Sequence, residues 1–143
     1  MAFDRHDYGL ATIRILIGMF FIFEGLGKLR WLIDSSMLSQ QLANWAATAG
    51  PRAGWYLEHV ARPYAAVFAR LVVLGELGGG IALVLGVATP IVAALLCVMV
   101  LNFHFASGAL VKFSAGSNPY VFPVTGALLG LIIGGRRLPW SLR

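Results

Sequence analysis

The chain has 143 residues, which is enough for one compact domain and too few for two ordinary ones. Hydrophobic residues make up 59% of the chain and charged residues only 12%, whereas a typical soluble domain has about 25% charged residues. Together with a mean hydropathy of +0.80, this composition favours a membrane protein. The single cysteine, Cys97, excludes an internal disulfide and a zinc or iron–sulfur site built from several cysteines of this chain.

The net charge is +5, but the basic residues lie near the ends of the apolar runs. We interpret them as anchors at the membrane surface, so no nucleic-acid partner is expected. Charged residues interrupt the first apolar run at Arg14, Glu24 and Lys28, and no small-residue cleavage site follows that run. We therefore expect that it is not a cleaved signal peptide.

Four segments approach the length of about 20 apolar residues that a membrane span requires. They are residues 8–30, 63–87, 89–107 and 119–135. Only the residues GVATP join the second segment to the third, which predicts a tight antiparallel hairpin with Pro90 in the first turn of the third helix. The sequence thus predicts an all-α integral membrane four-helix bundle. We expect a single domain over residues 1–143, with both termini on one side of the membrane.

The longest connection, residues 31–62, contains a helical pattern of its own. Three apolar residues recur there at helical spacing and share one face: Leu38, Leu42 and Trp45. The polar residues between them lie on the other face: Gln40, Gln41 and Asn44. The pattern predicts a short amphipathic helix lying at the membrane interface. A loop helix packed over the bundle is the alternative. The stretch GPRAGWY at residues 50–56 is expected to form a turn followed by an aromatic anchor.

The first apolar segment carries charges at bilayer depth, where each charge costs at least about 2.5–3.5 kcal/mol on insertion scales. One helical stripe combines charged, small and aromatic residues: Arg14, Gly18, Phe21, Gly25 and Lys28. We expect this stripe to face the other helices rather than lipid. Glu24 precedes Lys28 by one turn, in the order that favours an ion pair.

A second buried carboxylate, Glu76, lies in the middle of the second apolar segment. A rise of about 1.5 Å per residue places Glu76 within reach of Arg14, and Arg70 level with Glu24. We predict two buried pairs, Arg14–Glu76 and Arg70–Glu24, with Lys28 near the second. Two interpretations stay open, since such pairs either fix the register of the helices or take part in proton or quinone chemistry.

Glycines in the same segment indicate close helix packing. Gly75 and Gly79 allow a neighbouring helix to approach, and Gly126, Gly130 and Gly134 form a similar ridge on the fourth segment. A nucleotide-binding loop is not indicated, because the strand context and the lysine of a phosphate loop are both missing.

The third segment contains two polar side chains, Asn102 and His104. A single histidine near a helix end is more typical of a hydrogen-bonded or interfacial residue than of a metal ligand. His6 and His59 both lie outside the predicted spans, so a second haem ligand is not evident. We therefore expect no metal or haem.

Three stretches of the chain carry glycines and charges in a fixed order. They are RILIGMFFIFEGLGKL (residues 14–29), GELGGGIALVLGVATP (75–90) and NPYVFPVTGALLGLIIGGRRLPWSL (118–142). Together they resemble the DoxX/DoxD-like membrane proteins over nearly the whole chain, and the long connection before the glutamate is closer to the DoxD type. The positions that match the family's motifs are Arg14, Gly18, Gly25, Lys28, Glu76, Gly79, Gly80 and Asn118.

The resemblance implies a four-helix membrane subunit linked to oxidoreductases, with cytoplasmic termini. DoxD-like proteins are associated with thiosulfate:quinone oxidoreductase, which passes electrons from a sulfur compound to the quinone pool. This chain departs from the family pattern at its end. An acidic residue commonly follows the Ser-Leu pair in the family, whereas Arg143 follows it here.

These observations predict a subunit of a quinone-linked oxidoreductase in the cytoplasmic membrane of a bacterium or archaeon, with quinone as its bound redox molecule. We expect Glu76, Arg14 and His104 to line a pocket in which a quinone headgroup exchanges protons. Four further polar residues are candidates for binding the quinone: Glu24, Lys28, Arg70 and Asn102.

The expected partners are the lipid bilayer, other membrane or redox subunits, and further copies of the chain that pack through the glycine-rich helices. Two other functions are compatible with the same sequence. One is a non-catalytic assembly or scaffold subunit of a larger membrane complex. The other is a small proton-coupled transporter.

Overall fold

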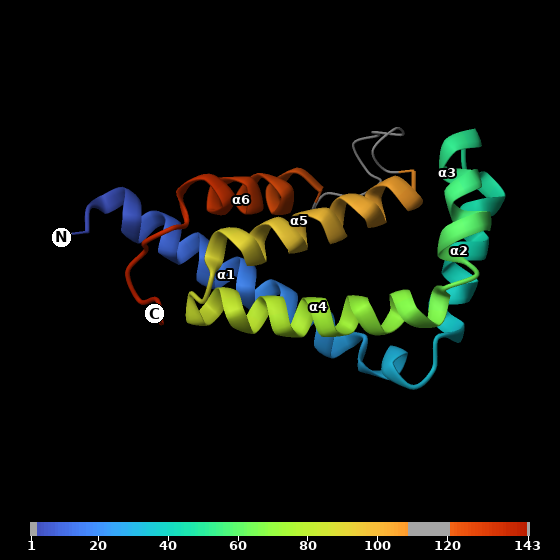
Figure 1. Cartoon of the computed structure of the whole chain (residues 1–143), viewed down its shortest axis with the longest axis horizontal. Helices are drawn as coiled ribbons and strands as arrows, with labels where there is room; N and C mark the ends of the chain where they lie inside the picture. Colours follow the sequence, from blue (N-terminus) through green and yellow to red (C-terminus); the bar gives the residue numbers. More distant parts are fainter. Residues whose placement is uncertain (1–2, 109–120, 143) are drawn as a thin grey trace.

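The computed structural model describes residues 3–108 and 121–142, and every regular element in these two ranges is a helix (Figure 1). The elements in chain order are α1 (Arg5–Gly27), η1 (Leu29–Leu32), α2 (Ser36–Thr48), α3 (Pro51–Tyr56), η2 (Leu57–Ala61), α4 (Ala65–Leu85), α5 (Thr89–Ala106) and α6 (Val121–Gly134). The predicted all-α fold class is therefore confirmed.

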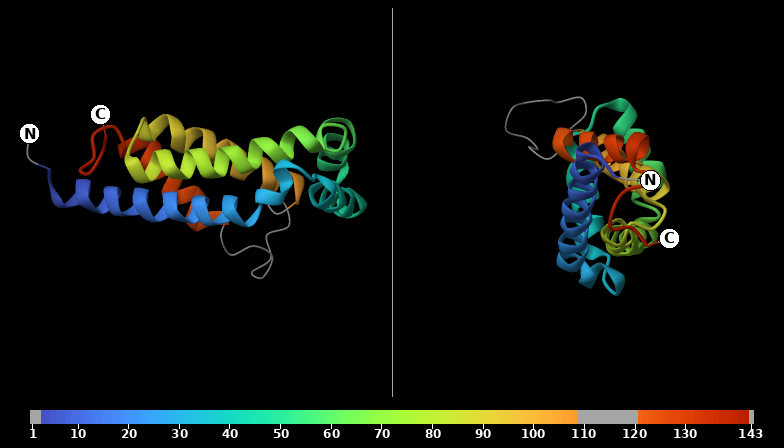
Figure 2. Two further views of the ribbon diagram at one scale, coloured as in Figure 1. Left: turned by 90° about the horizontal axis from the view of Figure 1, so that it is seen from below. Right: turned by 90° about the vertical axis from the view of Figure 1, so that its left-hand side faces the viewer.

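The four helices α1, α4, α5 and α6 form an antiparallel bundle. α1 packs along α4, α4 against α5, α5 against α6, and α6 against α1, so the four helices close into a ring. Both termini lie at the same end of this bundle (Figures 1 and 2).

Three of the four predicted spans are found as helices that are long and apolar enough to cross a membrane, namely α1, α4 and α5. The fourth, α6, is apolar but has only 14 described residues, and the first two residues of the predicted span, 119 and 120, lie outside the described ranges. The outward faces of all four helices carry large hydrophobic side chains. Examples that are at least 60% exposed are Leu16, Phe23, Leu74, Leu95 and Ile133.

α1 begins at a capping box. The Asp4 carboxylate accepts hydrogen bonds from the backbone N–H groups of His6 and Asp7, and the Asp7 carboxylate accepts one from the Asp4 N–H. The bond from the Asp7 N–H is the main reason that the pKa of Asp4 is lowered. A carboxyl whose pKa is lowered by folding stabilises the fold above its unfolded pKa. The cap therefore loses its contribution as the pH falls and Asp4 takes up a proton.

Glycines bring the backbones of α1 and α4 into contact. A Cβ atom placed on Gly18 would lie 2.8 Å from the carbonyl oxygen of Gly80, and one placed on Gly80 would lie 2.7 Å from the carbonyl oxygen of Gly18. Gly25, seven residues after Gly18 on α1, lies against Leu77, three residues before Gly80 on α4. These contacts fix how far α1 slides along α4, and with it which polar residues meet.

The other glycines divide into packed and open positions. Gly79 faces Leu96 of α5, and Gly75 faces Met99, so their predicted role in helix packing is confirmed. The predicted ridge on α6 is different, because among the described residues only its last member, Gly134, meets another helix. A Cβ atom at Gly126 or Gly130 would have no atom of residues 3–108 or 121–142 within 4 Å.

The connection between α1 and α4 covers the end of the bundle away from the termini (Figures 1 and 2). α2 buries Leu38 and Leu42 there, as the amphipathic pattern predicted. The expected turn at residues 50–56 is instead the helix α3, because Pro51 occupies a first helical turn, a position that its fixed φ favours. The helix continues through the π-helical turn η2 and ends just before α4.

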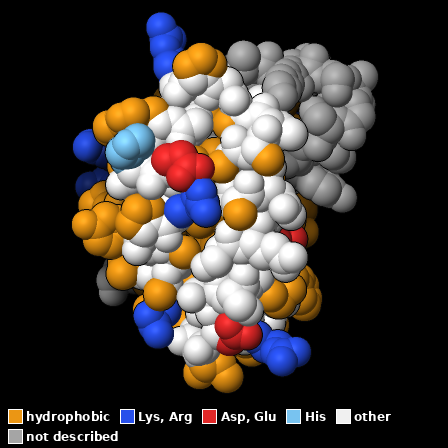
Figure 3. All heavy atoms as spheres, turned by 90° about the vertical axis from the view of Figure 1, so that its right-hand side faces the viewer, with side chains coloured by type: hydrophobic (Ala, Val, Ile, Leu, Met, Phe, Trp, Pro, Cys, Tyr) orange, Lys and Arg blue, Asp and Glu red, His pale blue; other side chains and the backbone are white. Residues whose placement is uncertain are grey.

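Aromatic contacts attach this covering layer to α5. The Trp45 ring meets Phe103 with a centroid distance of 5.9 Å, and the Tyr56 ring meets Phe105 at 5.7 Å. The outer face of the layer carries acidic and basic side chains scattered among hydrophobic and polar ones (Figure 3). α2 therefore packs over the bundle, and its place at a membrane interface stays a prediction.

The contact between α1 and α4 predicts the effect of one added methyl group. Gly80→Ala should lower the free energy of unfolding by about 1–3 kcal/mol, because the methyl group would overlap backbone atoms of α1. Gly78→Ala on the same helix is the matched control, since a Cβ there meets nothing within 4 Å. Unfolding of both variants in detergent measures the difference, and equal stability of the two would contradict the tight contact.

Candidate functional site

A lysine between two glutamates forms the charged cluster of the bundle. Lys28 Nζ lies 2.7 Å from Glu24 Oε2 on its own helix. It also lies 2.9 Å from Oε1 and 3.0 Å from Oε2 of Glu76 on α4. The predicted proximity of Lys28 to Glu24 is confirmed, and the partner of Glu76 is this lysine. The Glu24–Lys28–Glu76 cluster thus joins α1 to α4.

The three side chains of the cluster differ in burial. Glu76 is buried, with 9% of its side chain exposed, whereas the Lys28 side chain is 21% exposed and that of Glu24 is 47% exposed. The cluster therefore reaches from the interior of the bundle to its outer surface. Two carboxylates share one ammonium group, so the cluster has one more acidic group than basic groups.

The predicted pair Arg14–Glu76 is wrong. Arg14 lies beside Gly86, which is ten residues, or about 15 Å along the helix axis, from Glu76. The depth estimate failed because it assumed that Tyr8 and Val87 lie level at the ends of their helices. In the bundle, Gly18 faces Gly80, so α1 extends beyond the end of α4.

Arg14 instead holds the C-terminal segment. Its side chain is fully buried, and its guanidinium donates hydrogen bonds to the hydroxyl of Ser141 and, at 2.8 Å, to the carbonyl oxygen of Trp140. The Leu142 N–H completes the attachment by donating to the carbonyl oxygen of Leu85 at the end of α4. Nε of Arg14 has no hydrogen-bond partner in the part of the chain that the structure describes.

The predicted pair Arg70–Glu24 is also wrong. Arg70 is exposed on α4, and its guanidinium donates to the carbonyl oxygens of Leu32 and Ala66, each at 3.2 Å. The register set by the glycines places Arg70 beside η1, more than one turn beyond Glu24. Glu24 is paired with Lys28 instead.

The polar residues of α5 lie apart from the charged cluster. The Asn102 side chain accepts a hydrogen bond of 2.7 Å from the Tyr56 hydroxyl, which attaches the covering layer to α5. His104 is buried near the end of α5. Gly75, the neighbour of Glu76, faces Met99 of α5, so His104 lies five residues, or about 7.5 Å along the axis of α5, from the level of Glu76. The structure thus does not bring Arg14 and His104 to Glu76, and their roles in catalysis stay predictions.

No group of three or more His, Cys, Asp or Glu side chains that could hold a metal ion occurs within the described ranges.

Comparison with known families matches residues 9–109, which are most of the chain and run from the second turn of α1 to the end of α5, to the DoxX family. The chain belongs to the DoxX family. DoxX proteins are membrane proteins that are often linked to quinone-associated oxidoreductase subunits, and the three long apolar helices of this chain agree with a multi-pass membrane protein. No curated protein and no solved structure matches the chain.

The positions that carry the family resemblance divide between the two helices that pack most closely. Arg14, Lys28 and Glu76 are the charged ones, and Gly18 and Gly80 supply the contact between the backbones. Asn118, the last position of the motif, lies outside the described residues.

Sequence analysis of this DoxX protein missed Ser141 and Trp140 as partners of Arg14. The signal that would have pointed to them lies after α6. Pro139 favours a turn there, and the carbonyl oxygen of Trp140 and the hydroxyl of Ser141 can both accept hydrogen bonds close to the end of the chain. Trp140 adopts a positive φ of 56°, a conformation that propensity does not predict for tryptophan.

Removing the lysine of the cluster tests its energetic role. Lys28→Met should lower the free energy of unfolding by about 3–5 kcal/mol, because it leaves the Glu76 carboxylate buried without a counter-ion. Lys28→Met/Glu76→Leu should recover most of this loss. Arg70→Met is the matched control, because it removes one exposed cation from the neighbouring surface. Denaturation in detergent gives the comparison, and a Lys28→Met loss no larger than that of Arg70→Met would contradict the prediction.

Proposed function

We propose that this DoxX protein is the membrane subunit of a quinone-linked oxidoreductase, and that the Glu24–Lys28–Glu76 cluster supplies protons to the quinone. The observation that carries the proposal is the arrangement of this cluster. A lysine holds one buried carboxylate and one half-exposed carboxylate within 3.0 Å, on helices that are apolar enough to span a bilayer.

The donor and acceptor groups of the cluster suit a quinone headgroup. A quinone carbonyl accepts hydrogen bonds, and reduction of the quinone to quinol takes up two electrons and two protons. Lys28 is a donor, and a protonated Glu24 would be a second donor at the surface of the bundle. Because Glu24 is half-exposed on an apolar face, a hydrophobic quinone could reach it from the bilayer.

Each residue of the cluster then has a distinct role. Glu24 hydrogen-bonds the quinone oxygen at the bundle surface and gives it a proton. Lys28 orients Glu24 and compensates the charge that remains. Glu76 holds Lys28 in place from the interior. In its protonated form it replaces the proton that Glu24 has given up, by transfer through Lys28, so that the two carboxyl groups supply both protons of the quinol and take up two protons from water before the next reduction. Groups positioned for proton transfer in this way contribute about 10²–10⁴-fold to a rate.

The electrons would come from a partner subunit. The polar side chains described above contain no redox centre, so oxidation of a sulfur compound such as thiosulfate, as in the DoxD-like type, would take place on a second protein. We propose that the assembly lies in the cytoplasmic membrane of a bacterium or archaeon with the termini of this chain in the cytoplasm.

A second candidate function, a scaffold subunit, is supported by the open face of α6. The positions of Gly126 and Gly130 leave room for another helix to approach the backbone, as small residues do in membrane helix pairs. A further copy of the chain or another membrane subunit could pack on this face. In that case the charged cluster only joins α1 to α4.

Glu76→Gln distinguishes the two functions. The amide keeps the size of the side chain and can still accept a hydrogen bond from Lys28, but it cannot carry a proton at neutral pH. The full chain is purified with its native partners in mild detergent, and thiosulfate-dependent quinone reduction and the retained partners are measured. For a proton-supplying cluster we expect about a 100-fold loss of rate with unchanged yield and partners.

Glu58→Gln is the matched control. Glu58 also pairs with a cation one turn away, Arg62 at 2.6 Å, but lies on the covering layer and is half-exposed. This variant should keep the full rate. If Glu76→Gln keeps both its rate and its partners, the catalytic proposal fails and the scaffold function remains.

A further inference from the structure

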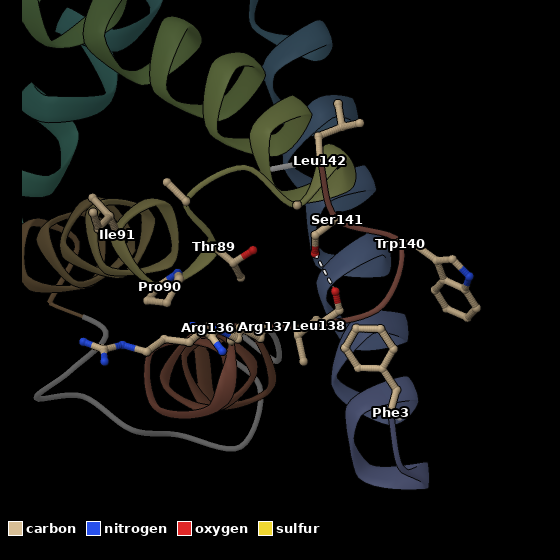
Figure 4. Close-up of a pocket in the computed structure, with 13 residues that line it drawn as sticks. Phe3, Thr89, Pro90, Ile91, Arg136, Arg137, Leu138, Trp140, Ser141 and Leu142 are labelled. Carbon is tan, nitrogen blue, oxygen red and sulfur yellow. Dashed lines mark hydrogen bonds between the residues drawn. The ribbon is translucent and has the colours of Figure 1, made fainter. Parts of the chain in front are cut away.

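A cavity of about 870 Å³ lies at the end of the bundle that carries the termini (Figure 4). Its walls come from the turn between α4 and α5, the residues that follow α6, and the C-terminal segment. The charged cluster on α1 and α4 does not contribute to it. The charged residues among those that line this cavity are both arginines, Arg136 and Arg137.

A polar residue of the cavity wall, Thr89, lies at the start of α5. Its side chain is 97% buried, since only 3% of the residue is exposed, and its hydroxyl points into the cavity (Figure 4). No hydrogen bond from this hydroxyl to another described residue is found. The helix start has no side-chain cap, because the preceding residue is Ala88. Pro90 has no N–H, and the N–H groups of Ile91 and Val92 donate to the carbonyl oxygen of Ala88, so the donor at this end of α5 is the Thr89 hydroxyl, and the helix dipole there favours an anion.

A buried positive charge lies behind the wall of the cavity. Gly86 and Ser141 line the cavity, and the Arg14 guanidinium is in contact with both residues. Arg14 is fully buried, and its hydrogen bonds within the described ranges go to neutral oxygens only. Since a buried ion without a counter-ion costs several kcal/mol, an anion held in the adjacent cavity would lower the energy of Arg14.

Two further arginines line the cavity. Arg136 and Arg137 follow α6 and are exposed, and neither forms an ion pair with a described residue. The acidic groups nearest in sequence to the cavity-lining Phe3 are Asp4 and Asp7, whose carboxylates are bound in the capping box of α1. The positive charge at this end is therefore not neutralised by the described side chains around the cavity.

We propose that this cavity binds a phosphate-type oxyanion, with the Thr89 hydroxyl as its donor and Arg136 and Arg137 as its counter-charges. The volume exceeds that of a small ion, and Phe3, Ile91 and Leu142 add apolar surface. Both features suit an anionic lipid headgroup with the start of its acyl chains. The same donors also bind a free phosphate, so the two sources share one recognition chemistry.

The test uses the purified full chain in detergent and measures its thermal unfolding midpoint. One arm compares sodium phosphate with sodium chloride at equal ionic strength. The other compares phosphatidylglycerol with phosphatidylcholine. We expect a rise of at least ~3 °C in one arm. A rise with phosphatidylglycerol alone assigns the site to a lipid headgroup, and a rise with phosphate assigns it to a free oxyanion.

Two variants connect the effect to the cavity. Thr89→Val removes the hydroxyl with little change of shape, and Arg136→Gln/Arg137→Gln removes the two charges. Each should abolish most of the rise. The controls are Thr12→Val, on the exposed face of α1, and Arg30→Gln/Arg52→Gln, which removes two exposed charges from the other end of the bundle. These controls should keep the rise.

Binding is also measured directly, by counting the phosphatidylglycerol molecules that each variant retains in native mass spectrometry and by equilibrium dialysis of labelled phosphate. This readout does not depend on stability, so a destabilised variant still gives a result. The proposal is overturned if neither anion binds or raises the midpoint. It is equally overturned if Thr89→Val and the arginine variant bind as much as the unchanged chain.

Discussion

The contact between Gly18 and Gly80 determines where every charge in the bundle lies. Because neither residue has a side chain, the backbones of α1 and α4 touch, and a shift of one helix along the other would drive side chains of neighbouring turns into backbone atoms. The register that results puts Lys28 beside Glu76 and Arg14 beside Gly86. Van der Waals contact between small residues, rather than attraction between charges, thus selects the ion pairs. This order of causes is expected in a bilayer, where lipid is as apolar as the helix surfaces.

Glu76 and Arg14, the two most buried charged residues that the structure describes, are stabilised in different ways. Glu76 has a cation at 2.9 Å, and that cation is shared with a carboxylate at the bundle surface. Arg14 has only a hydroxyl and a carbonyl oxygen, both from the C-terminal segment. The first arrangement has one more acidic group than basic groups, and the proposed proton transfer rests on this excess. In the second arrangement no carboxylate of a described residue balances the charge of Arg14, and the hydrogen bonds of Arg14 attach the C-terminal segment to the bundle.

The sequence predicted the parts of the structure that depend on local pattern. Apolar length located α1, α4 and α5, helical spacing located α2, and the alternation of charge and glycine identified the inward stripe of α1. The pairing of charges depended on the offset between two helices, which no local pattern contains. A depth estimate from helix ends is accurate only if the ends are level, and α1 extends beyond α4. The contact of Arg14 with Ser141 spans 127 residues, so it follows from the closed ring of four helices and not from any short motif.

The same geometry separates the two candidate sites while connecting them mechanically. Glu76 and Gly86 are ten residues apart on α4, about 15 Å along its axis, so a ligand at one end does not touch the side chains of the other. Gly80 lies between them and faces α1. Arg14 and Lys28 extend from one continuous helix. A displacement of α1 along α4 would therefore change two distances at once, that from Lys28 to Glu76 and that from Arg14 to Ser141. An anion in the cavity beside Gly86 would therefore act on the same two helices as the charged cluster, and the contact between Gly18 and Gly80 keeps the register of both ends the same.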